Sequence, residues 1–228
     1  MNTAERISVL LAEDHTIIRE GLKALLADED DIEVVGEAAN GREAVRLIQK
    51  LRPAVVVMDI AMPQLNGLEA IRQIREDLPD IKVIILSAHE NDLYVERAAE
   101  LGASGYLIKQ TSVHFLSEAI RTVHQGHTVF SPAVSNRFNE RRQVHPGREG
   151  SSKAESAQLN SREAEVLQLI AEGGANKQIA QELSISVKAV EKRRAQISQK
   201  LGIRNTAGLT RYAVATGIIE SRARLSID

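Results

Sequence analysis

The sequence predicts an α/β fold, a five-stranded parallel sheet with helices on both faces, followed by a smaller all-α unit of four helices. Short apolar runs alternate with amphipathic stretches five times in the first half of the chain. Several of these runs are apolar and β-branched on consecutive positions, which is typical of strands covered on both faces. Strand-like runs then stop after Ile108, and only helical patterning follows the loop-like residues beyond. These observations indicate a βα-repeat domain joined to a helical one.

Each βα unit can be placed on the chain by its residue pattern. The predicted strands are Ile7–Ala12, Ile32–Ala38, Val55–Asp59, Lys82–Ser87 and Gly105–Ile108. The predicted helices are Thr16–Ala27, Gly41–Lys50, Leu65–Glu76, Leu93–Leu101 and Val113–His124. Five βα units in succession imply parallel strands joined by right-handed crossovers.

The two halves of the chain differ in charge. Residues 1–126 carry 13 Lys and Arg against 21 Asp and Glu, whereas residues 127–228 carry 16 against 10. An acidic half joined to a basic half indicates two domains with different partners, and the basic half is the candidate for nucleic acid. The segment His145–Ser152 has no apolar periodicity and is rich in turn residues. We therefore predict a first domain at residues 1–127, a linker at 128–158 and a second domain at 159–228.

Composition excludes several classes of protein. The chain has no cysteine, which rules out disulfides, cysteine-ligated zinc and thiol nucleophiles. Its longest apolar runs are far too short to cross a bilayer, and its first residues show no signal peptide. We expect a cytoplasmic protein that has no membrane partner.

Acidic residues stand where predicted strands end. Glu13 and Asp14 follow the first strand, and Asp59 ends the third. In an open parallel sheet, ligands bind beyond the carboxyl ends of the strands. Three clustered carboxylates repel one another and need a cation, and an oxygen-rich site suits Mg²⁺ or another divalent ion.

Two more strand ends supply complementary groups. Ser87 ends the fourth strand and brings a hydroxyl, while Lys109 follows the fifth and brings an ammonium. A carboxylate, a metal, a hydroxyl and an ammonium together form a phosphoryl-transfer site. Asp59, the deepest of the acidic residues in its strand, is the predicted nucleophile.

The second domain carries a helix-turn-helix pattern. Asn160 and Glu163 are spaced as a capping box for its first helix. A short helix near Asn176–Leu183 and a tight turn lead into a longer basic helix at Val187–Leu201, and a last helix spans about Thr206–Thr216. On the long helix, polar residues share one face, and we expect Val187, Val190, Ile197 and Leu201 to face the core.

Four segments resemble the signatures of two-component receiver domains: LLAEDHTIIREGLKALL, VVVMDIAMPQLNGLEAIRQIR, VIILSA and GASGYLIK. The resemblance spans about Ile7 to His127 and implies a flavodoxin-like (βα)5 fold. It implies that Glu13, Asp14, Asp59 and the main-chain carbonyl of Ala61 hold Mg²⁺, and that Asp59 accepts a phosphoryl group from a sensor histidine kinase. It also implies that Ser87 and Lys109 bind the phosphoryl oxygens, and that Tyr106 and Ser87 form a conformational switch.

The segment LNSREAEVLQLIAEGGANKQIAQELSISVKAVEKRRAQISQKLGIRN resembles a LuxR-type helix-turn-helix. The domain order is that of NarL/FixJ response regulators, which implies a DNA-binding transcription regulator that pairs into a homodimer on double-stranded DNA through its last helix, with RNA polymerase as a further candidate partner. The family commonly has Thr and His where this chain has Ala189 and Arg193. By family position, the residues expected at DNA are Lys177, Lys188, Glu191, Lys192, Arg193, Arg194, Ala195 and Lys200.

Three other interpretations are less consistent with the sequence. A phosphorylation-independent DNA-binding regulator, whose receiver is only a protein-interaction module, is disfavoured by the intact pocket. A haloacid-type phosphohydrolase would need a second Asp where this chain has Ala61. The only catalysis we expect is self-phosphorylation from a donor and slow self-hydrolysis, so we predict no enzyme. The glycine spacing Gly36–Gly41 resembles a P-loop but lacks the Lys that must follow. His15, beside the acidic pair, could be a metal ligand, but we favour its interpretation as a surface histidine.

Overall fold

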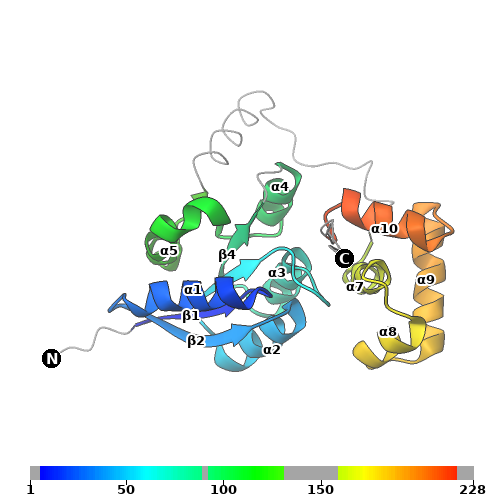
Figure 1. Ribbon diagram of the computed structural model, residues 1–228, viewed down its shortest axis with the longest axis horizontal. Coiled ribbons are helices and arrows are strands. Elements are labelled where there is room, and N and C mark those ends of the chain that lie inside the picture. Colours follow the sequence, from blue (N-terminus) through cyan, green and yellow to red (C-terminus); the bar gives the residue numbers. More distant parts are fainter. Residues whose placement is uncertain (1–5, 89–91, 131–158, 220–228) are drawn as a thin grey trace, which may run out of the picture. The chain divides into compact units, whose positions relative to one another are not determined.

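The computed structural model describes residues 6–88, 92–130 and 159–219 (Figure 1). The chain divides into two compact units, residues 1–150 and 151–228, and each is considered by itself. Most of the predicted linker, residues 131–158, lies outside the described residues. Within the described residues, no helix combines the length and the apolar character needed to cross a membrane.

The first unit is built on a parallel sheet in the order β2-β1-β3-β4-β5-β6. All five predicted strands have their predicted bounds: β1 (Ile7–Ala12), β2 (Ile32–Ala38), β3 (Val55–Asp59), β4 (Lys82–Ser87) and β5 (Gly105–Ile108). The strand order reverses between β1 and β3, which is where ligands bind in open sheets of this kind.

The predicted count of five strands was wrong, because the sheet has a sixth. β6 (Val129–Phe130) pairs in parallel with β5, opposite Gly105 and Tyr106. A two-residue strand is too short to show periodicity, and these residues fell within the predicted linker. Gly105 permits the pairing, since a Cβ there would lie 2.9 Å from the carbonyl oxygen of Val129.

The core of the first unit lies in two layers, one on each face of the sheet. Alternate residues of a strand enter opposite layers, so Leu10 and Val9 belong to different clusters. Helices α2 (Gly41–Leu51), α3 (Gly67–Asp77) and α4 (Asp92–Glu100) cover the layer that contains Leu10. Helices α1 (Thr16–Ala27) and α5 (Lys109–His124) cover the other layer. Strands buried on both faces explain why the apolar runs in the sequence are continuous.

Helix bounds follow local capping. Asn40 and Asn66 cap α2 and α3, each accepting a hydrogen bond from the backbone N–H three residues on. Helix α1 spans the predicted residues, whereas α5 begins at Lys109, four residues before the predicted start at Val113. The extra turn places Lys109 at the N-terminal end of a helix directly after β5.

The second unit has four described helices, as predicted: α7 (Ser161–Ala171), α8 (Asn176–Glu182), α9 (Val187–Leu201) and α10 (Thr206–Ala215). The capping box of Asn160 and Glu163 is present at the start of α7. Val190 and Ile197 are fully buried in one apolar cluster that joins all four helices. Val187 was predicted to face the core but is 39% exposed, because it is the first residue of α9 and the buried stripe starts one turn later.

Candidate functional site

Strand register brings the predicted site residues to one edge of the sheet. Asp59 on β3 lies opposite Leu86 of β4, and Ser87, the next residue, lies opposite Ile108 of β5. Glu13 directly follows β1, and Lys109 directly follows β5. The carboxyl ends of four strands therefore converge, as the sequence predicted.

Lys109 joins the two most buried carboxylates. Its Nζ atom lies 2.9 Å from Oδ2 of Asp59 and 2.8 Å from Oε2 of Glu13. Asp59 is 3% exposed and Glu13 is 1% exposed. Although burial opposes its charge, the carboxylates of Asp59 and Glu13 raise the pKa of Lys109 above its ordinary value. The pocket thus holds one ammonium between two carboxylates, with little solvent to screen them.

Asp59 has an unusual affinity for protons. Burial, and then the negative charge of Glu13, raise the pKa of Asp59 to about 6. Lys109 and a hydrogen bond from the backbone N–H of Ala61 act in the opposite direction. At neutral pH Asp59 is therefore mostly ionised, but its negative charge is poorly stabilised. A nearby cation would stabilise that charge.

The pocket can hold a divalent cation. Ligand atoms of Glu13, Asp14, His15 and Asp59 all lie within 4.8 Å of one another. Three of the four ligands are carboxylates, the donors that Mg²⁺ prefers in proteins. The donor set therefore fits the predicted metal, and it includes His15, which the sequence analysis interpreted as a surface histidine.

The loop after Asp59 is held close beneath it by Gly67, which the sequence analysis did not single out. The backbone N–H of Gly67 donates to the carbonyl of Ile60 at 2.8 Å. A Cβ on Gly67 would lie 2.3 Å from the carbonyl oxygen of Asp59, so a larger residue requires the backbone to move. The signal that could have identified Gly67 is a glycine several residues after an Asp that ends a strand.

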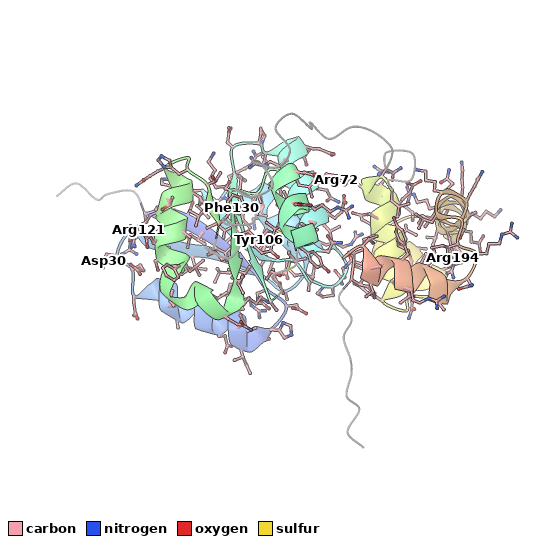
Figure 2. The ribbon with its side chains drawn as sticks, turned by 90° about the horizontal axis from the view of Figure 1, so that it is seen from above. Asp30, Arg72, Tyr106, Arg121, Phe130 and Arg194 are labelled. Atoms are coloured by element: carbon pink, nitrogen blue, oxygen red, sulfur yellow. The ribbon has the colours of Figure 1, made fainter. Side chains whose placement is uncertain are left out.

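The predicted switch residues, Ser87 and Tyr106, lie on one face of the sheet. Tyr106 pairs with Ile85, and Ser87 follows Ile85 by two positions, so both side chains leave the sheet on the same side. The Tyr106 ring is fully buried in the layer beneath α4, and on its other side the strand pairs with Phe130 of β6 (Figure 2).

On the second unit, the predicted DNA-contacting residues fall into two groups. Most lie on the solvent side of α8 and α9: Lys177, Lys188, Glu191, Lys192 and Ala195 are exposed, and Arg193 is half-buried. Ser186 caps α9 by accepting a hydrogen bond from the backbone N–H of Ala189 at 3.2 Å. The first turns of α9 therefore present polar side chains on a firmly started helix.

Two predicted contacts, Arg194 and Lys200, are engaged within the unit. Arg194, which Figure 2 labels on the second unit, donates hydrogen bonds to the side chains of Asn176 on α8 and Thr206 on α10. Nζ of Lys200 lies 2.7 Å from Oε2 of Glu163, which is buried at the start of α7. In the described geometry both cations tie helices together, a role that a one-dimensional charge pattern does not show.

Each of the two units matches a known protein family. Residues 9–121 match the family described as response regulator receiver domain, and residues 157–213 match bacterial regulatory proteins of the luxR family. The chain is 38% identical over 219 residues to the transcriptional regulatory protein MctR of Rhizobium johnstonii, covering 96% of this chain and 98% of MctR. It is 35% identical over 228 residues to the transcriptional regulatory protein DegU of Brevibacillus brevis, covering 95% of this chain and 97% of DegU.

Among solved structures, a structure of two RcsB dimers bound to two parallel DNAs matches with a TM-score of 0.57 and 25% identity, covering 93% of this chain and 99% of RcsB. The alignments with MctR and DegU cover both units of this chain, and the two family matches fall one on each unit. The chain therefore belongs to the NarL/FixJ class of two-component response regulators, in which a receiver domain is joined to a LuxR-type DNA-binding domain.

Proposed function

We propose that a sensor histidine kinase phosphorylates Asp59, and that the phosphoryl group controls how the second unit binds DNA and regulates transcription. The observation that carries this proposal is the environment of Asp59. It is a buried carboxylate at a strand end, with an ammonium 2.9 Å away and a second carboxylate close enough to raise its pKa. Such a carboxylate can act as a nucleophile, and the ammonium of Lys109 is already in place to bind the phosphoryl oxygens of the phosphorylated product.

In the transfer step, a carboxylate oxygen of Asp59 attacks the phosphorus of the donor. The P–N bond of a phosphohistidine, or the P–O bond of a small acyl phosphate, breaks as the new P–O bond forms. The leaving group keeps the bonding electron pair, and an imidazole leaving group takes up a proton. Lys109 and the hydroxyl of Ser87 then bind the phosphoryl oxygens, and Lys109 exchanges one anionic partner for another.

We assign the divalent ion, Mg²⁺ in the first instance, to Glu13, Asp14, Asp59 and the main-chain carbonyl of Ala61. Bound there, it neutralises charge on the phosphoryl oxygens. The mutual closeness of the carboxylate oxygens supports this assignment. Apart from phosphoryl transfer to itself and slow self-hydrolysis, we assign no catalysis to the chain.

The response to phosphorylation passes through Ser87 and Tyr106 in this proposal. A phosphoryl group draws the Ser87 hydroxyl toward the sheet edge, and this movement changes the space available to the ring of Tyr106, which is buried on the same face. Because Tyr106 packs in the layer beneath α4, its position alters the α4 surface. A change on that surface either frees the second unit or favours dimers.

For DNA, we place the start of α9 in the major groove, with Glu191, Lys192 and Ala195 facing the bases and Lys177, Lys188 and Arg193 at phosphates. The exposure of these side chains supports this placement, apart from the half-buried Arg193. RcsB forms dimers on DNA, and we propose the same of this chain through α10, which implies two half-sites. We also propose a cytoplasmic location, in keeping with a DNA-binding role, and RNA polymerase as a candidate partner.

The test is phosphorylation by acetyl phosphate with and without Mg²⁺, followed by intact mass. We expect one phosphoryl adduct on the wild type and on Asp80→Asn, an exposed carboxylate control, and none on Asp59→Asn. The same samples are then compared by gel shift on genomic fragments. An adduct that persists in Asp59→Asn overturns the assignment. Unchanged DNA binding, with no adduct on the wild type despite bound Mg²⁺, favours the phosphorylation-independent regulator.

A further inference from the structure

His15 stands directly against the acidic pocket. It follows Glu13 and Asp14 at the end of β1 and is the N-cap residue of α1. Its Nδ1 atom lies 2.9 Å from Oδ1 of Asp14 and 3.0 Å from Oε1 of Glu13. The side chain is 58% exposed, so solvent and ions reach it.

The spacing of these atoms is that of neighbouring ligands on one metal ion. In an octahedral site with bonds of about 2.1 Å, adjacent ligand atoms are about 3.0 Å apart, and opposite ones about 4.2 Å. The two nitrogen–oxygen contacts, one of which is itself a hydrogen bond between Nδ1 of His15 and Oε1 of Glu13, have this adjacent separation. Asp59 completes a set whose members all lie within 4.8 Å, so small movements suffice to close it around an ion.

The backbone fixes His15 in this position. Its N–H donates to Oε1 of Glu13 at 3.2 Å, and the carbonyl of Glu13 accepts a hydrogen bond from Nη1 of Arg19 at 2.7 Å. The helix begins at the next residue, Thr16, so the backbone of His15 is held on both sides, and the imidazole is oriented by its contacts with Asp14 and Glu13. A ligand held in place before the ion arrives loses little entropy on binding.

We propose that His15 supplies a nitrogen ligand to the divalent ion in this pocket, so that the pocket favours first-row transition ions, such as Mn²⁺ and Co²⁺, over Mg²⁺. The inference rests on the proposed function in that the same pocket holds the ion needed for phosphorylation. Imidazole binds transition ions well, whereas Mg²⁺ takes oxygen ligands and water. Removing the ring therefore weakens Co²⁺ and Mn²⁺ binding much more than Mg²⁺ binding.

The experiment compares the full-length wild type with His15→Ala and His15→Asn, the second of which retains a polar side chain without the imidazole. His124→Ala, an exposed histidine at the end of α5, is the matched control. Titrations give the affinities for Mn²⁺, Co²⁺ and Mg²⁺. Pulsed electron paramagnetic resonance on the Mn²⁺-loaded protein reports directly whether a ¹⁴N nucleus is bound to the ion.

We expect ¹⁴N coupling in the wild type and in His124→Ala, and its loss in both His15 variants. Both His15 variants should lose at least about tenfold in Co²⁺ affinity, with Mg²⁺ affinity changed less than about twofold. A wild type that binds Mn²⁺ without ¹⁴N coupling, or equal losses for Co²⁺ and Mg²⁺, overturns the inference and leaves Asp59 phosphorylation intact. A wild type that binds none of the three ions overturns the inference together with the metal part of the proposed function.

Discussion

Replacing Asp59 by asparagine should stabilise the first unit at neutral pH. The pKa of Asp59 is raised from 3.8 to about 6 by burial and by Glu13. An acid whose pKa is higher in the folded state than in the unfolded state weakens the fold once the pH exceeds the unfolded value. One pKa unit corresponds to about 1.4 kcal/mol, so ionised Asp59 costs the native state about 3 kcal/mol.

The pH dependence of this effect is specific. Between pH 3.8 and about 6 the folded state holds a proton that the unfolded state has released, so wild-type stability falls as the pH rises through that window. Above pH 6 the penalty is constant. The free energy of unfolding of Asp59→Asn, minus that of the wild type, should therefore grow from about pH 4 to 6 and then level off.

Native-state hydrogen exchange of peptides from β1 and β3, measured in urea by mass spectrometry, reads the stability of the first unit within the intact chain. Asp80→Asn, a change at an exposed carboxylate, should show no comparable pH dependence. Saturating Mg²⁺ should reduce the advantage of Asp59→Asn, because the ion stabilises the wild type by mass action and the variant lacks one ligand. A difference that does not vary with pH, or a variant less stable than the wild type at pH 8, would refute the reasoning.

Four further substitutions form two pairs, one that tests the space around two glycines and one that tests which lysines contact DNA. Gly67→Ala should slow phosphorylation and lower stability by about 1–3 kcal/mol, because its Cβ meets the Asp59 carbonyl at 2.3 Å. Gly21→Ala in α1, with open space around it, should instead stabilise by up to about 1 kcal/mol in urea unfolding. Lys192→Ala should weaken DNA binding and reduce the salt slope by about one without changing stability. Lys200→Ala should lower the stability of the second unit and leave the salt slope unchanged, because it pairs with Glu163; a reduced salt slope would return Lys200 to the DNA surface.

Much of the fold could be predicted because its signals are local. Most of the five strands are short apolar runs, and the capping box at Asn160 marks a helix start in the residues themselves. β6 gave no such signal, because two residues carry no period and the pairing depends on the space left by Gly105. The early start of α5 at Lys109 likewise depends on how the chain leaves β5, which patterning does not specify.

The site could be predicted as a set of strand-end residues, but not in its detailed contacts. The rule that ligands bind beyond strand ends brought Glu13, Asp59 and Lys109 together from three distant segments. It could not show that Lys109 bridges two carboxylates, or that His15 faces the pocket, since both depend on side-chain direction. Nor could it show the ion pair between Lys200 and Glu163, because a charged residue looks the same in sequence whether it meets solvent or a buried carboxylate.

The most direct test of the central claim is the DNA affinity of one protein sample before and after phosphorylation, on the fragment bound best in gel shift. We predict that the phosphorylated wild type binds more tightly by a factor between about 5 and 150, the usual range for coupled sites. Asp59→Asn, treated identically, should show no change. Equal affinities for the two forms of the wild type, with the adduct confirmed by mass, would contradict the account and separate the chemistry of Asp59 from the control of DNA binding.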